Sequence, residues 1–118
     1  MAMRTPREVF HHHFAALQAG DVDDVMSDYS RDSVVITPGG AARGIAAIRQ
    51  GITMLLAEIP EAKWQVKTQI YDDCILFLQW AAHSKTTKVE DGVETYLFKD
   101  GLIHTQTVHF TLCNSKKY

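Results

Sequence analysis

The hydrophobic positions of this chain follow helical spacing in its first half and strand-like alternation in its second half. Phe10, Phe14 and Leu17 fall on one helical face, and that run ends at Gly20. Thr5-Pro6-Arg7-Glu8 comes just before it and matches a capping box with proline at the first helical position. The pattern therefore predicts a first helix between this box and Gly20.

Two more helices and a short strand are predicted before Pro60. A second helix, capped by Asp21, has its apolar positions at Val22, Val25, Met26 and Tyr29. The β-branched segment from Ser33 to Thr37 predicts a strand that Pro38-Gly39-Gly40 ends. A third helix closes at Pro60, and its apolar residues are Ile45, Ile48, Ile52, Leu55, Leu56 and Ile59.

From Lys63 onward the pattern changes to long alternating strands. The predicted strands are Lys63 to Tyr71, Cys74 to His83, Val93 to Phe98 and Leu102 to Leu112. Early helices followed by a strand-rich half indicate an α+β fold, in which the three N-terminal helices cover the concave face of a curved, mainly antiparallel sheet. A chain of 118 residues has room for one core, so we expect a single domain over residues 1–118, with a pocket inside the covered sheet.

Two-residue turns at Asp72-Asp73 and Asp100-Gly101 predict which side chains share a sheet face. Around the second turn, the expected opposite pairs are Phe98 with Ile103, Tyr96 with Thr105 and Glu94 with Thr107. His109 then lies one diagonal step from Glu94, close enough for their side chains to meet.

Around the first turn, one face is mostly apolar with a few isolated polar groups, as ligand pockets are, and we expect it to point inward. It consists of Trp64, Val66, Thr68, Ile70, Ile75, Phe77, Gln79, Ala81 and His83. The opposite face mixes Gln65, Lys67 and Gln69 with Tyr71, Leu76, Leu78 and Trp80. A half-apolar outer face predicts a homodimer interface through Tyr71, Leu76, Leu78 and Trp80.

Glu94 is the candidate for chemistry, because it shares its predicted strand face with Tyr96 and Phe98. Burial on such a face raises the pKa of a carboxyl toward neutral pH, where acid/base catalysis is efficient. His109 is its candidate catalytic partner. The alternative is a structural Glu94 that hydrogen-bonds Thr107 or His109 and holds the last hairpin in register. The expected substrate contacts are Phe14, Tyr29, Trp64, Thr68, Gln79, His83, Tyr96 and Thr107.

Composition and charge exclude several other functions. A net charge of −2 provides no electrostatic attraction to nucleic acid. The sequence contains no apolar run of the roughly 20 residues that a membrane span needs and no secretory signal, so we expect a soluble, cytoplasmic protein. Cys74 and Cys113 have neither metal-binding nor disulfide spacing, and we interpret both as reduced thiols.

His11-His12-His13 is the most conspicuous motif, but consecutive helical residues point about 100° apart and cannot converge on one metal ion. We expect His11 and His12 to face solvent and His13 to lie beside the pocket floor.

Asp91 precedes Gly92 and is interpreted as a turn residue. No phosphate-binding loop, nucleophile elbow or metal-ligand cluster occurs, so we expect no metal and no cofactor.

The order of elements and the segment DGVETYLFKDGLIHTQTVHF, from Asp91 to Phe110, resemble the SnoaL-like branch of the nuclear-transport-factor-2-like superfamily. The resemblance covers nearly the whole chain. It implies a cone-shaped α+β barrel, commonly dimeric through the outer sheet face. Members of this superfamily include polyketide cyclases, ketosteroid isomerases, dehydratases and epoxide hydrolases. In the cyclases and isomerases an acid occupies the position that matches Glu94.

Two departures narrow what this resemblance implies. Ketosteroid isomerases carry their general-base aspartate where this chain has Thr37. The similar epoxide hydrolases use an aspartate, arginine, aspartate set, and the strands assigned above contain no inward arginine. Both departures argue against those two reactions.

Two functions are consistent with the sequence. The first is a cofactor-independent enzyme of the isomerase, cyclase or dehydratase type, in which Glu94 moves a proton beside a carbonyl of a small hydrophobic compound, assisted by His109. The second is a noncatalytic homodimer that binds a hydrophobic metabolite, with Glu94 serving only as a hydrogen-bond partner.

Overall fold

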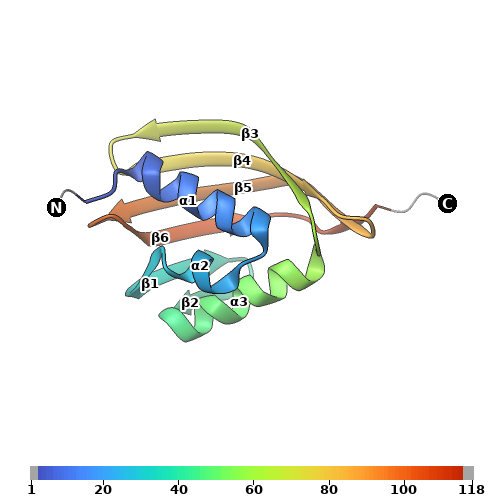
Figure 1. The fold of residues 1–118 in the computed structure, drawn as a ribbon, viewed down its shortest axis with the longest axis horizontal. Helices are drawn as coiled ribbons and strands as arrows, with labels where there is room; N and C mark the ends of the chain where they lie inside the picture. The colour runs from blue at the N-terminus through green and yellow to red at the C-terminus, as the bar shows by residue number, and fades with distance from the viewer. Residues whose placement is uncertain (1–2, 116–118) are drawn as a thin grey trace.

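The computed structural model describes residues 3–115, which form three helices and one curved sheet of seven strands (Figure 1). The helices are α1 (Pro6–Ala19), α2 (Val22–Met26) and α3 (Ile45–Glu58). The strands are β1 (Tyr29–Thr37), β2 (Gly40–Arg43), β3 (Lys63–Asp72), β4 (Ile75–His83), β5 (Thr87–Lys99), β6 (Leu102–His109) and β7 (Cys113–Asn114).

The predicted boundaries of α1 are confirmed by its caps. Thr5 Oγ1 accepts the Glu8 N–H at 3.2 Å and Glu8 Oε1 accepts the Thr5 N–H at 2.8 Å, so the capping box is complete. Gly20 ends α1 in the left-handed conformation at φ 68°. Tyr29 was expected on the second helix and instead begins β1, because α2 ends at Met26 and Tyr29 pairs with β6.

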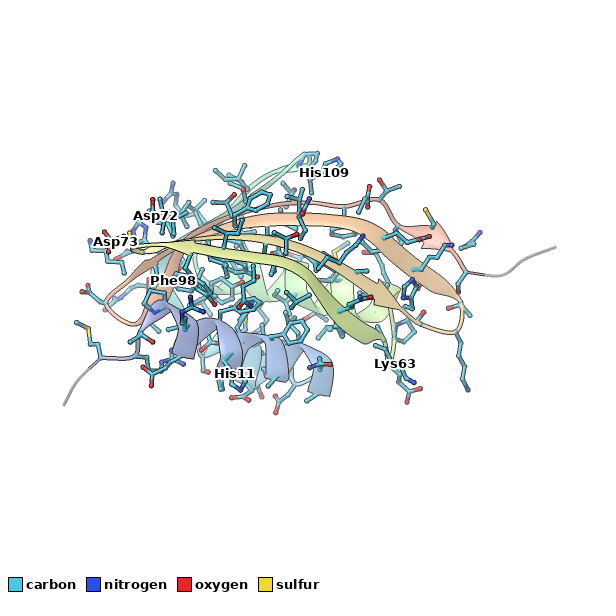
Figure 2. All side chains as sticks on the ribbon, turned by 90° about the horizontal axis from the view of Figure 1, so that it is seen from above. His11, Lys63, Asp72, Asp73, Phe98 and His109 are labelled. Atoms are coloured by element: carbon cyan, nitrogen blue, oxygen red, sulfur yellow. The ribbon has the colours of Figure 1, made fainter. Side chains whose placement is uncertain are left out.

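The sheet has the strand order β2-β1-β6-β5-β4-β3, with β7 added at one end of β5. All neighbours are antiparallel except β1 and β6, which run parallel. The helices lie on the same side of the sheet and leave its other face uncovered (Figures 1 and 2). The α+β class and the curved, mainly antiparallel sheet are confirmed, but the sheet stays open between its edge strands β2 and β3 and does not close into a complete barrel.

A β-bulge at His104 changes the register predicted for the last hairpin. Phe98 does lie opposite Ile103, but beyond the bulge Tyr96 lies opposite Gln106 and Glu94 opposite Val108. One extra residue in a strand moves every later side chain to the other face. Thr105, Thr107 and His109 therefore point outward, and their predicted inward orientation is wrong.

The inward face predicted for β4 is also wrong. Leu76, Leu78 and Trp80 are at most 2% exposed and pack beneath the helices, so they cannot form a dimer surface. Half-buried Tyr71 faces the same side and packs against the Arg7 guanidinium, 4.2 Å from its ring centre. Alternation grouped these residues correctly, but the apolar character of Ile75 and Phe77 suggested the wrong group as the core.

A second bulge, at Lys67 in β3, places the residues that were predicted to share one face of this strand on two different faces of the sheet. Trp64 and Val66 pack against the core as expected, whereas Thr68 lies opposite Gln79 on the outer face. Ile70 follows on that face and is 59% exposed. No helix within residues 3–115 is long and apolar enough to cross a membrane.

Trp80 requires a glycine opposite it. It pairs with Gly92 across the sheet, and a Cβ on Gly92 would lie 2.2 Å from the indole ring. The indole also packs against Trp64 and Phe110, with ring centres 5.2 and 5.6 Å away. Gly92 therefore leaves the space in which this aromatic group assembles.

Gly92→Ala should lower the free energy of unfolding by about 2 kcal/mol, because the new methyl group displaces a fully buried ring. Gly51→Ala is the matched control, since a Cβ there meets nothing within 4 Å and alanine favours a helix by up to about 1 kcal/mol. Urea unfolding of both variants checks this. Equal stability of Gly92→Ala and wild type would contradict the close packing described here.

Candidate functional site

A cavity of about 280 Å³ lies between the covered face of the sheet and helices α1 and α3. Most of its wall is apolar, and the aromatic residues Trp64, Trp80 and Phe110 line one part of it. Its polar residues are His13, Thr37, Glu58, Glu94, Tyr96 and Gln106. An apolar cavity with a few polar side chains is the usual form of a small-molecule site.

Glu94 lies at the polar end of this cavity, on β5, and is 8% exposed. Its Oε1 accepts hydrogen bonds from the Tyr96 hydroxyl at 3.1 Å and from the Gln106 side-chain amide at 2.5 Å. Within residues 3–115, Oε2 accepts no hydrogen bond, and it is therefore the oxygen left for a ligand.

Burial raises the pKa of Glu94 to about 7, and the hydrogen bonds from Gln106 and Tyr96 oppose this shift only in part. Burial likewise raises the pKa of Tyr96 well above its usual value, so its hydroxyl stays protonated at neutral pH. Glu94 therefore exists in both its acid and its carboxylate form near pH 7.

A chain of buried polar groups continues from Glu94 toward α1. The Tyr29 hydroxyl donates to Gln106 Oε1 at 2.5 Å and lies 3.5 Å from His13 Nε2. His13 Nδ1 lies 3.2 Å from the Asp28 carboxylate. Four elements, α1, β1, β5 and β6, thus meet around one polar network.

Asp28 is fully buried and closes this network beside the surface. Burial alone would raise its pKa, but hydrogen bonds with His13, His12 and Arg4 outweigh burial and lower the pKa below its usual value. Arg4 donates at 2.9 Å, and the His12 imidazole lies 2.8 Å from the carboxylate. Asp28 is therefore an ionised, paired carboxylate that holds α1 against the start of β1.

The structure brings together three of the predicted site residues, Glu94, Tyr96 and Trp64, which all line the cavity. Phe14 lines a separate shallow depression beside Arg7 and Tyr71. Tyr29 uses its hydroxyl within the protein and does not line the cavity.

The remaining predicted site residues lie on the outer face of the sheet. Gln79, His83, Thr107 and His109 are exposed there, and Thr68 is half-buried. Figure 2 shows His109 on the side of the sheet away from the helices. The predicted contact between Glu94 and His109 is therefore wrong, because the bulge at His104 turns the histidine away.

Sequence reasoning missed Gln106 and Asp28 and gave His13 only a place beside the pocket. Gln106 could have been found only by anticipating the bulge, for which the segment around His104 carries no signal. His12 was expected in solvent but binds Asp28 and Asp24. Within residues 3–115, no three His, Cys, Asp or Glu side chains are grouped so as to hold a metal ion.

Several solved structures share this fold. The epoxide hydrolase/cyclase-like enzyme SalBIII, which has a role in pyran ring formation in the polyether salinomycin, superposes with a TM-score of 0.78 at 17% identity, over 90% of each chain. A nuclear-transport-factor-2-like protein of unknown function from Cytophaga hutchinsonii has a TM-score of 0.75 at 14% identity, over 93% of each chain. A Sinorhizobium meliloti protein, provisionally assigned as a polyketide cyclase, has a TM-score of 0.72 at 15% identity, over 86% of this chain and 93% of its own.

At these identities the structural matches establish the fold alone, and no curated protein matches the sequence. The family model of the SnoaL-like domain, in contrast, matches residues 10–105. That match runs from α1 into β6 and includes Glu94 and Tyr96, which lie at the polar end of the cavity. The chain therefore belongs to the SnoaL-like domain family.

Proposed function

We propose that this protein is a cofactor-independent enzyme of the isomerase, cyclase or dehydratase type, in which Glu94 transfers a proton on a small hydrophobic carbonyl compound. The observation that carries the proposal is a buried carboxyl, with its pKa raised to about 7 and one oxygen free of hydrogen bonds, in the wall of an apolar cavity. A general acid or base works best when its pKa lies near the working pH.

In the proposed reaction, the Glu94 carboxylate takes a proton from the carbon beside the substrate carbonyl, and the electron pair of that C–H bond forms an enolate. The neutral Glu94 then returns the proton. Return to another carbon isomerises the compound, and return to a departing hydroxide releases water. In a cyclisation, the enolate carbon attacks a second carbonyl and the new alkoxide takes the proton.

Thr37 is suited to bind the substrate oxygen at the cavity mouth. Its Oγ1 accepts the Gly39 N–H at 3.0 Å, and its own O–H remains to donate. The cavity volume corresponds to about nine water-sized groups, at roughly 30 Å³ each. A bicyclic ketone such as 2-tetralone is therefore a suitable probe.

Wild-type protein should accelerate exchange of the α-protons of 2-tetralone with D₂O, and Glu94→Gln should abolish that acceleration. NMR spectroscopy measures the exchange rate. Glu90→Gln is the matched control, because this exposed glutamate of the same strand forms an ion pair with Lys88 at the surface. Acceleration by Glu94→Gln equal to that of wild type would refute the role of Glu94. Binding of 2-tetralone without any acceleration would favour the noncatalytic, metabolite-binding alternative.

The raised pKa of Glu94 also predicts how stability depends on pH. Between pH 4.5, the usual pKa, and about 7, the folded protein retains a proton that the unfolded chain releases. The free energy of unfolding therefore falls as the pH rises through this window. Above the window Glu94 is ionised in both states and causes no further change with pH. The free energy of unfolding of Glu94→Gln, minus that of wild type, should therefore increase by about 3 kcal/mol from pH 4 to pH 8.

Urea unfolding of both proteins at each pH provides this comparison. His12 also makes the protein less stable as the pH rises above 6.5, because its hydrogen bond with Asp28 raises its pKa in the folded state. The difference between the two proteins cancels that contribution. A difference that stays constant from pH 4 to pH 8 would show that Glu94 has an ordinary pKa.

We also infer a homodimer through the uncovered sheet face, with an interface different from the one expected from sequence. Exposed apolar side chains form its centre, with Ile36 43%, Phe77 38%, Ile75 44% and Ile70 59% exposed. Thr95 and Thr107 complete the row that joins Ile36 to Phe77. A neutral, apolar centre lets two copies face each other without like-charge repulsion.

Phe77→Glu should convert a dimer into a monomer, because it places two carboxylates in the centre of the interface. Light scattering after size-exclusion chromatography measures the mass. Met54→Glu is the control, since Met54 is 58% exposed on α3, on the other side of the sheet. A dimeric Phe77→Glu variant, or a monomeric wild type, would contradict this interface.

A further inference from the structure

The side-chain amide of Gln106 has a defined orientation between Tyr29 and Glu94. Its Oε1 accepts the Tyr29 hydroxyl at 2.5 Å, and its Nε2 donates to Glu94 Oε1 at 2.5 Å. In the opposite orientation the amide oxygen would face the Glu94 carboxyl, which is favourable only when that carboxyl carries the proton. The two orientations of Gln106 therefore favour opposite protonation states of Glu94.

Tyr29 is the residue that selects between these orientations. Burial raises the pKa of Tyr29 well above its usual value, so its hydroxyl keeps its proton at neutral pH. His13 Nε2 is the competing acceptor, but at 3.5 Å it is too distant to form more than a weak hydrogen bond. The Tyr29 proton is thus directed to Gln106 Oε1, which turns the amide N–H toward Glu94.

The Tyr29 ring is itself held in place by α1. The His13 ring packs edge-on against it, with centres 5.4 Å apart and planes at 77°. Asp28 in turn binds His13 Nδ1 at 3.2 Å. The hydroxyl of Tyr29 therefore has little freedom to leave Gln106.

The orientation of Gln106 also determines which oxygen of Glu94 exchanges its proton. Gln106 and Tyr96 both donate to Oε1, and a proton on that oxygen would collide with theirs. On a neutral Glu94 the proton therefore lies on Oε2, the oxygen open to the cavity.

We propose that Tyr29 is a positioning residue, whose hydroxyl orients the Gln106 amide so that Glu94 exchanges its proton through the cavity-facing Oε2. The inference rests on the proposed acid/base function of Glu94. The ionisable groups that face Glu94 or its cavity are Tyr96 on its own strand, Tyr29 on β1, His13 on α1 and Glu58 on α3, with Asp28 behind His13. Tyr29→Phe removes one hydroxyl and changes none of the other charges.

Tyr29→Phe should raise the pKa of Glu94 by about one unit above its wild-type value, because the freed amide turns its oxygen to the carboxyl or withdraws its N–H. The measurement is ¹³C NMR titration of the Glu94 carboxyl carbon, assigned by comparison with Glu94→Gln. Tyr71→Phe is the matched control and should leave the Glu94 titration unchanged, because Tyr71 packs on Arg7 and contacts neither Gln106 nor Glu94.

Gln106→Met removes the donor itself and should raise the pKa of Glu94 at least as much as Tyr29→Phe does. It therefore also tests the hydrogen bonds that link Tyr29 to Glu94 if Tyr29→Phe does not fold. An unchanged Glu94 titration in Tyr29→Phe, or in Gln106→Met where only that variant folds, would overturn the proposal. The titration needs no substrate. Its failure would therefore leave the proton-exchange result for Glu94 standing, and failure of the exchange assay would leave the titration result standing.

Discussion

A carboxyl group inside an apolar cavity needs hydrogen-bond donors, and the pair that Gln106 and Tyr96 provide to Glu94 organises the whole polar end of this site. Tyr96 lies two residues along the same strand. Gln106 comes from the next strand and reaches Glu94 only because a bulge at His104 turns it inward. The shorter side chains of Thr105 and Thr107, which would otherwise face the cavity, could not bridge Tyr29 and Glu94.

The same network fastens helix α1 to the sheet. Asp28 is buried between the first helix and the first strand, and three side chains near the N-terminus satisfy it: Arg4, His12 and His13. A buried charge is tolerated when all of its hydrogen-bond partners are present, and removing one partner destabilises the folded state. The position of α1, which forms part of the cavity wall, is therefore coupled to the hydrogen bonds that reach Glu94.

Local patterns were enough to predict most of the fold. The capping box at Thr5, the left-handed glycine at Gly20 and the apolar periodicities located α1, α3, β3, β4 and β6 within a few residues, whereas β5 begins at Thr87 and not at the predicted Val93. Glu94, Tyr96 and Trp64 were also identified as pocket residues. These features depend on residues close together in the chain, whose periodicity and capping chemistry can be read directly.

Local sequence patterns were sufficient for the class of fold, the ends of α1 and α3 and the presence of an acid in an apolar strand. Which faces of the sheet look inward depends on contacts between residues distant in the chain, and these contacts place Gln106 and His13, rather than Thr107 and His109, beside Glu94. This difference arises because side chains along a strand alternate between the two faces of the sheet. One bulged residue at Lys67 or His104 reverses the face of every residue beyond it, and such a bulge is stabilised by packing across the sheet and not by its own sequence.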